Sequence, residues 1–401
     1  MKISMYDVNF GECILYEEDS KQLLVDCGAK YGKAGALACA QVQKDLGNNA
    51  DLMITHFDED HYNGIIEMPK GTTFKTVYLP LYIWHNGEAN TTAKVFIDTI
   101  KSLAYLFIMG KPKLSVLQKL FVKLPELVTH ITDIKCIGAG EKIIMGTHQF
   151  DVLWPEEKPA ILGRRSAVCY SEELINILFE EEYLFAKEAK NAAEEYVNAF
   201  VSLYSFYVKS ETSNDIIDET PYDFGESTDG SPLIEQWKKL QFNFVAAYEN
   251  LKQFKSEPLS PPMKARVNAI FGSLIKGMNA CSIVWHNDIC LACGDITPGV
   301  MSYLQPKLQH FYQLIKVSHH GTKSYFTHNL PNAGIYIISN NGSYRTNWGI
   351  DERYPTRYNC CCTNNNDARC CVYRRCRHCN DHITQPARIF CVCSDGCCVV
   401  T

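Results

Sequence analysis

The chain has 401 residues, of which 46% are hydrophobic and 21% are charged, and its formal net charge is −6. This composition is that of a soluble globular protein, and it excludes a disordered tail, a collagen-like fibre and a strongly basic nucleic-acid coat. No apolar run approaches the roughly 18–20 residues of a membrane span. The first twenty residues carry charges where an export signal would be apolar, so we expect a cytoplasmic protein with no membrane partner.

Short apolar strands alternate with helical stretches in the first part of the chain, which predicts an α/β protein. We expect strands at 2–8, 13–16, 22–28, 51–55 and 75–82, and a helix at 33–46. A helical period covers 92–124, with a break near Gly110 and Pro112, and 141–154 is typical of a strand pair.

Residues 165–265 are interpreted as an acidic helical insertion between a first half, 1–164, and a second half, 266–352. A polar loop is expected at 211–231 and a helix at 233–255. The insertion is either a lid or a surface for a protein partner, or else a solvated helical face without a specific partner.

The strand pattern returns after the insertion. A strand pair is expected at 281–285 and 289–293, followed by a helix at 298–309 and by strands at 312–317 and 335–339. The chain ends in a cysteine-rich tail, 353–401.

Four potential metal ligands follow the apolar strand 51–55 within six residues, namely His56, Asp58, Asp60 and His61. A loop at the end of a strand can direct alternate side chains at one point, and histidine with carboxylate suits zinc, manganese or iron. The alternative is a polar surface loop that happens to be rich in Asp and His. Two later strand ends support the metal interpretation, because they carry Asp295 and His319.

With these residues the chain resembles the metallo-β-lactamase-fold hydrolases, in the branch typified by the hydrolase domain of the competence protein ComEC. The resemblance covers about residues 1–345, and the insertion matches poorly. It rests on short stretches at 7–15, 24–28, 56–61, 279–282 with 294–295, and 319–324.

The resemblance implies a four-layer αββα sandwich with two divalent metal ions, Zn²⁺ or Mn²⁺, at one edge of the sheets. It implies His56 and Asp58 as ligands of the first ion, Asp60, His61 and His319 as ligands of the second, and Asp295 as the bridge. Asn279 stands where many members have a first-metal histidine, so it is a candidate ligand there. This departure gives the first site more oxygen and fewer nitrogen ligands, that is, a harder ligand set, which keeps Mn²⁺ as a rival to Zn²⁺.

The resemblance favours a phosphodiesterase that uses a metal-activated hydroxide, with Asp60 orienting that hydroxide. Lys323 can hold a phosphate oxygen as a point charge, and the alternative is a solvated surface lysine. We expect the substrate site to be lined by His320, Thr322, Lys323, Ser324, Asn340 and Asn341.

The negative charge balance argues against binding of a long duplex, so a nucleotide-like molecule or a short single-stranded nucleic acid is the expected substrate. Hydrolysis of a β-lactam or a thioester is a second chemistry open to the same fold. A non-catalytic scaffold or interaction protein is the alternative from another class.

Eleven of the nineteen cysteines fall within 360–398. Cys376 and Cys379 have the spacing of a zinc knuckle, which makes a structural zinc module, with a partner or RNA on its arginines, one interpretation of the tail. Adjacent cysteines at 360–362 fit no ligand spacing, so a poorly constrained or oxidisable extension, or a redox sensor, is the alternative. The eight earlier cysteines are interpreted as small buried residues.

Overall fold

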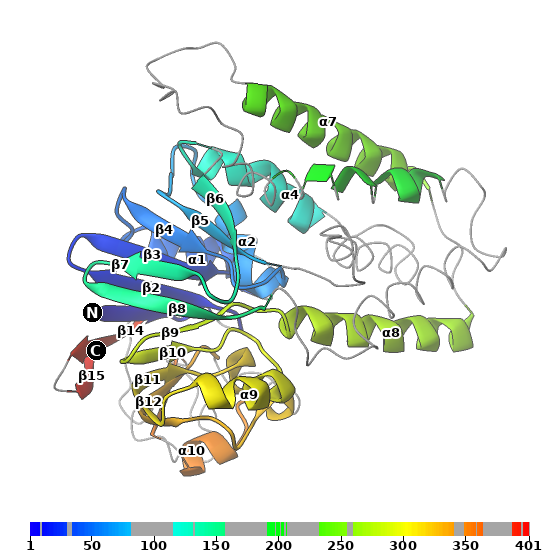
Figure 1. The fold of residues 1–401 in the computed structure, drawn as a ribbon. Helices are drawn as coiled ribbons and strands as arrows, with labels where there is room; N and C mark the ends of the chain where they lie inside the picture. The colour runs from blue at the N-terminus through cyan, green and yellow to red at the C-terminus, as the bar shows by residue number, and fades with distance from the viewer. Residues whose placement is uncertain are drawn as a thin grey trace.

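The computed structural model of the chain consists of two mixed β-sheets with α-helices outside them, which confirms the predicted α/β class (Figure 1). It describes residues 1–8, 10–29, 34–81, 115–130, 133–156, 232–254, 260–340, 349–357, 359–363, 387–393 and 396–400, together with scattered helical residues within 191–206.

The first sheet has eight strands in the order β15-β14-β1-β2-β3-β4-β5-β6. Neighbours from β15 to β3 pair antiparallel, and neighbours from β3 to β6 pair parallel. The strands are β1 (Lys2–Tyr6), β2 (Cys13–Glu18), β3 (Lys21–Cys27), β4 (Ala50–Met53), β5 (Val77–Pro80), β6 (Ile134–Ile137), β14 (Ala387–Cys393) and β15 (Gly396–Val400).

The second sheet has seven strands in the order β13-β12-β11-β10-β9-β8-β7. Neighbours from β13 to β10 pair parallel, and those from β10 to β7 pair antiparallel. The strands are β7 (Lys142–Met145), β8 (His148–Trp154), β9 (Val284–His286), β10 (Cys290–Ala292), β11 (Phe311–Lys316), β12 (Asn332–Ile338) and β13 (Cys360–Cys362).

Buried apolar side chains define the order of the layers. One cluster fills the space between the sheets, where Tyr16 of the first sheet meets the edge of Trp285 of the second at a ring distance of 4.9 Å. A second cluster covers the outer face of the eight-stranded sheet, and a third covers that of the seven-stranded sheet. The chain is therefore layered as helices, sheet, sheet and helices.

Seven α-helices are present among the described residues. The outer face of the first sheet is covered by α1 (Ala34–Val42), α2 (Glu59–Ile66), α4 (Ser115–Lys123) and, further out, α7 (Pro232–Lys252). The second sheet carries α9 (Pro298–Leu304) and α10 (Arg353–Arg357) on its outer face. None of these helices, nor α8 (Pro261–Asn279), combines the length and the hydropathy that a membrane crossing needs.

The acidic insertion is described only in part. Helix α7 confirms the helix expected at 233–255, and Phe244 at its centre packs against Tyr196 and Phe200 at ring distances of 5.4 and 5.2 Å. Phe200 also meets Phe121 of α4 at 5.0 Å, so the insertion is joined to the sheet through aromatic contacts. The loop expected at 211–231 and most of the helix expected at 92–124 lie outside the described residues.

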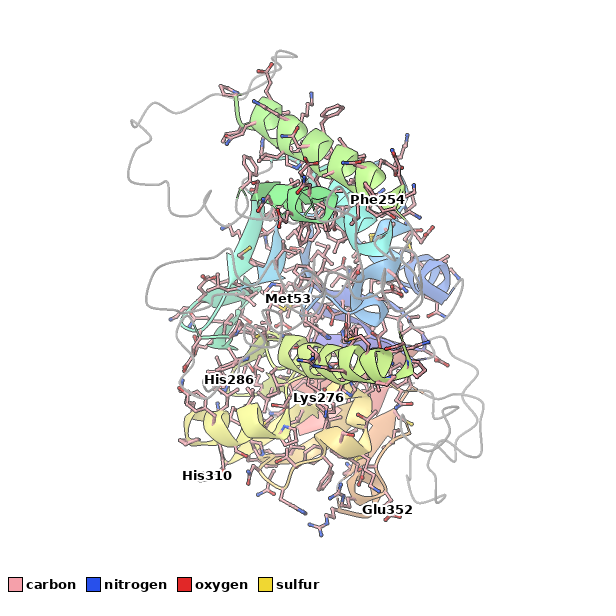
Figure 2. All side chains as sticks on the ribbon, turned by 90° about the vertical axis from the view of Figure 1, so that its right-hand side faces the viewer. Met53, Phe254, Lys276, His286, His310 and Glu352 are labelled. Carbon is pink, nitrogen blue, oxygen red and sulfur yellow. The ribbon has the colours of Figure 1, made fainter. Side chains whose placement is uncertain are left out.

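Helix α8 (Pro261–Asn279) was not predicted from the sequence. The prolines at its start resemble a helix stop, but proline is tolerated in a first helical turn, where the backbone N–H has no partner within the helix. Figure 2 shows α8 in front of the two sheets, with Lys276 on its last turn. The helix ends at Asn279, one of the candidate ligands.

The described parts of the tail are built into both sheets. β14 pairs along β1, and β13 pairs with β12 at the edge of the second sheet. Cys360, Cys361 and Cys362 are buried in β13, whereas Cys376 and Cys379 lie outside the described residues. Seven of the eight earlier cysteines are buried free thiols as predicted, and Cys169 lies outside the described residues.

Gly28 allows the end of β3 to approach the start of α2. A Cβ atom at this position would lie 2.5 Å from the carbonyl carbon of Asp60 and 2.6 Å from the backbone nitrogen of His61. Backbone atoms cannot move aside as a flexible side chain can, so the close approach requires glycine.

We predict that Gly28→Ala lowers the free energy of unfolding by about 1–3 kcal/mol, because the added methyl overpacks this contact. Gly272→Ala is the matched control, since its Cβ would meet nothing within 4 Å in α8. It should raise stability by about 0.5–1 kcal/mol, the helix preference of alanine over glycine. Urea unfolding monitored by circular dichroism measures both changes, and a neutral Gly28→Ala would contradict the packing described.

Candidate metal centre

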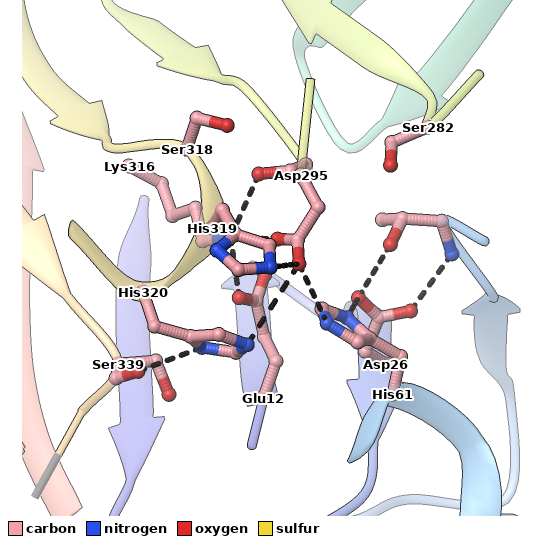
Figure 3. A network of polar contacts seen from close by, with 12 residues as sticks. Glu12, Asp26, His61, Ser282, Asp295, Lys316, Ser318, His319, His320 and Ser339 are labelled. Atoms are coloured by element: carbon pink, nitrogen blue, oxygen red, sulfur yellow. Dashed lines mark hydrogen bonds and ion pairs between the residues drawn. The ribbon is translucent and has the colours of Figure 1, made fainter. Parts of the chain in front are cut away.

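The candidate ligands lie where parallel strands of the two sheets end, at one shared edge (Figure 3). In the first sheet, β3 ends beside Asp26 and β4 is followed by the stretch 54–61. In the second sheet, β10 leads to Asp295 and β11 leads to His319. Convergence of the carboxyl ends of parallel strands is the usual place for a functional site in such sheets.

One oxygen of Asp295 lies at the centre of the group. Its Oδ2 atom is 3.3 Å from Nε2 of His61 and 3.7 Å from Nε2 of His56. It is also 3.8 Å from Nε2 of His319 and 3.8 Å from Nε2 of His320. Asp295 itself is 2% exposed. Four imidazole rings thus direct the same nitrogen at one buried carboxylate oxygen.

Asp26 anchors the two histidines that follow β4. Its Oδ2 accepts a hydrogen bond from Nδ1 of His61 at 2.7 Å and another from the Thr55 hydroxyl at 2.7 Å. Because the Thr55 proton is used in this way, Oγ1 of Thr55 accepts from Nδ1 of His56 at 3.1 Å. Both rings therefore carry a proton on Nδ1 and direct Nε2 at the cluster, where Nε2 is a lone pair whenever the ring is neutral.

The two adjacent histidines after β11 are held in the same way. Nδ1 of His320 donates to the carbonyl oxygen of Ser339 at 2.9 Å. The Thr322 hydroxyl donates to the carbonyl of His319, so its oxygen accepts from Nδ1 of His319 at 2.7 Å. Anchoring of Nδ1 by a hydrogen-bond acceptor is the arrangement that fixes a metal-binding histidine for coordination through Nε2.

A strained turn lets these neighbouring rings face the same atom. His319 and His320, in the short helix η5 (His319–Gly321), have φ values of 46° and 56°, in the left-handed region. Residues other than glycine occupy this region at a cost of about 1–3 kcal/mol each, and such strain gathers at functional sites. Tyr325 supports the turn, because its ring stacks on His319 at 3.8 Å.

The electrostatics of the cluster match the hydrogen bonds. Burial lowers the pKa of His56 to about 4, and burial likewise lowers the pKa of His319 to about 4, so both rings are neutral at pH 7. Burial opposes ionisation of Asp295, but the surrounding histidines outweigh it and hold its pKa well below the ordinary value. Burial also lowers the pKa of His61, yet Asp295 and Asp26 raise it well above the ordinary value.

These residues fit divalent cations. The Nε2 atoms of His56, His61 and His320 are buried and have no hydrogen-bond partner among the described residues. Three groups of three ligand atoms lie close enough to hold an ion, and all of them share His61. Its partners are His56 and Asp295 in the first group, Asp60 and His320 in the second, and Glu12 and Asp26 in the third. Buried lone pairs around a carboxylate are costly unless a cation or a proton lies between them.

The carboxylates around the cluster also favour divalent cations. Asp26, Asp60 and Asp295 are buried beside the histidines, and the nearby Glu12 and Lys316 form an ion pair. The overlapping groups of ligand atoms could hold one or two ions.

Most of the sequence-predicted ligands are brought together. Asp60 lies 3.5 Å from His320 and Asp58 lies 3.9 Å from His56, each measured from Oδ2 to Nε2. Asn279 is buried and its Nδ2 donates to the hydroxyl of Tyr325 at 3.0 Å. Both His319 and His320 face Asp295, and of the two it is His320 that groups with Asp60 and His61.

The residues expected to bind substrate divide into two groups. Lys323 and Ser324 are exposed in the short helix η6 (Lys323–Tyr325) beside the cluster. Thr322 and His320 are buried and take part in the anchoring described above. Asn340 is also buried and donates from Nδ2 to the carbonyl of His320 at 3.0 Å, whereas Asn341 lies outside the described residues.

Three charged residues of the site were not among the predicted functional residues, namely Glu12, Asp26 and Lys316. Each is at most 1% exposed. The signal available in the sequence was a charged side chain within or beside an apolar strand, as in the run 24–28 and the run 312–317. Charged residues in such positions are almost never fully buried unless they are paired.

Comparison of the chain with protein-family models and with curated protein sequences finds no match. The assignment of a function therefore depends on the geometry of the site.

We predict that Asp26→Asn weakens binding of a divalent ion by roughly 10–100-fold, because a carboxamide no longer anchors both His61 and Thr55. Asp45→Asn is the matched control, since the Asp45 side chain accepts a hydrogen bond from the Tyr6 hydroxyl at 2.7 Å and lies away from the cluster. Competition with a chromophoric chelator measures both affinities. An Asp26→Asn protein that folds and binds metal as tightly as the wild type would contradict the anchoring role.

Proposed function

We propose that the chain is a metal-dependent hydrolase of the metallo-β-lactamase fold that uses two divalent ions. The observation that carries the proposal is the convergence of four Nδ1-anchored imidazoles on Oδ2 of Asp295. Neutral imidazole and carboxylate ligands of this kind suit zinc and manganese.

The arrangement of the chain supports the family assignment. Two mixed sheets pack face to face with helices on both outer faces, and the candidate ligands follow strands in the order that the resemblance implies. The acidic insertion and the tail are additions around this frame. A fold alone does not determine a reaction, so the site has to carry the functional part of the proposal.

The proposed ligand sets follow the distances. His56 and Asp58 serve the first ion, with the amide oxygen of Asn279 as a further ligand. Asp60, His61 and His320 serve the second, because these three form one compact group. The resemblance implied His319 as the third ligand of the second ion, whereas the distances favour His320. His319 instead stacks on Tyr325, whose hydroxyl accepts a hydrogen bond from Asn279. This contact favours His319 as a ligand of the first ion.

Divalent ions in such a site supply an activated water molecule near neutral pH and polarise the oxygen of the substrate. Asp60 is placed beside His320, where it would help to hold an ion and to orient a water molecule. Lys323 and Ser324 are exposed next to the cluster, so they can bind an anionic group of the substrate.

We propose a phosphodiester in a nucleotide or a short single strand as the substrate. The exposed Lys323 suits a phosphate oxygen, and the net charge of −6 does not suit the backbone of a long duplex. A carbonyl substrate would need no cation at this position, so replacement of Lys323 should weaken binding of a phosphodiester more than that of a thioester.

The central test is metal content together with hydrolysis of bis-p-nitrophenyl phosphate in Zn²⁺ or Mn²⁺. The wild type should hold two ions per chain and cleave the ester, and a chelator should abolish cleavage and lower the melting temperature by mass action. Asp60→Ala/His61→Ala should lose at least one ion and reduce the rate at least 100-fold.

The control variant is Asp133→Ala/His130→Ala, which removes the same residue types from a turn away from the cluster and should behave as the wild type. A folded wild-type protein that binds no divalent ion would overturn the proposal and favour the scaffold interpretation. Two bound ions without cleavage of any phosphodiester would overturn the substrate class alone.

A further inference from the structure

Glu12 and Lys316 form a buried ion pair between the two sheets (Figure 3). Lys316 is the last residue of β11, and Glu12 directly precedes β2. Each residue is 1% exposed. The backbone of Glu12 is also fixed, because its N–H donates to the carbonyl of Asp60 at 3.0 Å and its carbonyl accepts from Gly28 at 2.9 Å.

Stability alone is a weak reason for such a pair. Removing two charges from water costs several kcal/mol per ion, and apolar residues of similar volume often stabilise a core equally well. On one side the pair meets apolar residues, since Leu314 and Ile337 of the neighbouring strand positions are fully buried. On the other side it borders the cluster, because ligand atoms of Glu12, Asp26 and His61 lie within 4.8 Å of one another. The position of the pair therefore suggests a task beyond joining the sheets.

Lys316 lies directly behind Asp295. Its Nζ atom is 3.8 Å from Oδ1 of Asp295 and donates to the carbonyl of Gly294 at 3.2 Å. The two oxygens of Asp295 therefore face different groups, because Oδ2 faces the four imidazole nitrogens and Oδ1 faces the ammonium group. Oδ1 is buried and has no hydrogen-bond partner among the described residues.

We propose that Lys316, held in place by Glu12, is a positioning residue that keeps Asp295 turned with Oδ2 toward both metal ions. This inference rests on the proposed two-metal function. The ammonium group attracts Oδ1 and opposes rotation of the carboxylate about its Cβ–Cγ bond. A carboxylate free to rotate can bind one ion through both oxygens, which leaves the other ion without its bridge.

The pair can be removed without changing the net charge of the site. Glu12→Gln/Lys316→Met deletes one negative and one positive charge, so a change in metal affinity cannot come from a change in the net charge of the site. If the pair only joins the sheets, the double variant loses stability and binds metal as before. If Lys316 positions Asp295, the double variant loses affinity for one of the two ions.

The experiment compares four proteins, which are the wild type, Glu12→Gln/Lys316→Met, Glu12→Asp/Lys316→Arg and Tyr312→Phe. The third protein keeps an ion pair, with a shorter acidic side chain and a longer basic one. The fourth is a control for destabilisation, because Tyr312 is buried in β11 and its hydroxyl contacts His286 at 2.7 Å, away from Asp295. Each metal-free protein is melted, titrated calorimetrically with Mn²⁺, and examined by electron paramagnetic resonance for the coupled signal of a bridged Mn²⁺ pair.

We expect the wild type and Tyr312→Phe to bind two Mn²⁺ ions and to give the coupled signal. The charge-neutral double variant should bind one ion at least tenfold more weakly and lose the coupling, and Glu12→Asp/Lys316→Arg should restore part of both. A double variant with unchanged affinities and coupling, whatever its melting temperature, would overturn the positioning role alone. A wild type that binds no Mn²⁺ or Zn²⁺ would overturn the proposed function and this inference with it.

Discussion

The convergence of lone pairs on Asp295 is the constraint on which the rest of the structure depends. Four imidazoles present Nε2 to one buried carboxylate oxygen, and each ring uses Nδ1 in a hydrogen bond behind it. The nitrogen lone pairs and the carboxylate oxygen repel one another unless cations or protons lie between them. Asp295 and Asp26 raise the pKa of His61, so a proton competes with a cation for its Nε2 atom. Metal binding should therefore release protons and stabilise the fold together.

The fold delivers these groups from distant parts of the chain to one edge. The first sheet supplies the stretch after β4, and the second supplies Asp295 and the two histidines of η5. The contacts between the sheets continue behind the cluster, where the Ser339 hydroxyl donates to the carbonyl of Gly11 and Lys316 pairs with Glu12. The relative position of the sheets is thus coupled to the geometry of the site. The described part of the insertion extends an outer helical layer, and the described parts of the tail extend the two sheets.

The sequence predicted the features that have a local signal. A polar run after an apolar strand identified His56, Asp58, Asp60 and His61, because the change of polarity and the ligand types occur together within six residues. It did not identify Asp26 or Lys316 as functional, since one charge at the end of an apolar run has no local sign that it is buried and paired. It assigned His319 to the metal and His320 to the substrate, whereas a left-handed turn directs both rings at Asp295.

Long-range pairing was the other limit. The prolines at the start of α8 resemble a helix stop, and their tolerance in a first turn depends on the chain that follows. The pairing of β14 with β1 joins residues almost 390 positions apart, and no pattern in either strand specifies the partner. Burial of Cys360, Cys361 and Cys362 likewise follows from the place of β13 at the edge of the sheet and not from their spacing.

The most direct test of the central claim is X-ray absorption spectroscopy of the zinc-loaded chain. The spectrum reports the atoms bound to the metal, and the chain offers nineteen cysteines as competing ligands. The account predicts a shell of nitrogen and oxygen atoms at about 2.0–2.1 Å, with imidazole scattering, and a second zinc at about 3.5–4 Å. A shell dominated by sulfur at about 2.3 Å would place the metal on cysteines and contradict the assignment of the His/Asp cluster as the metal centre.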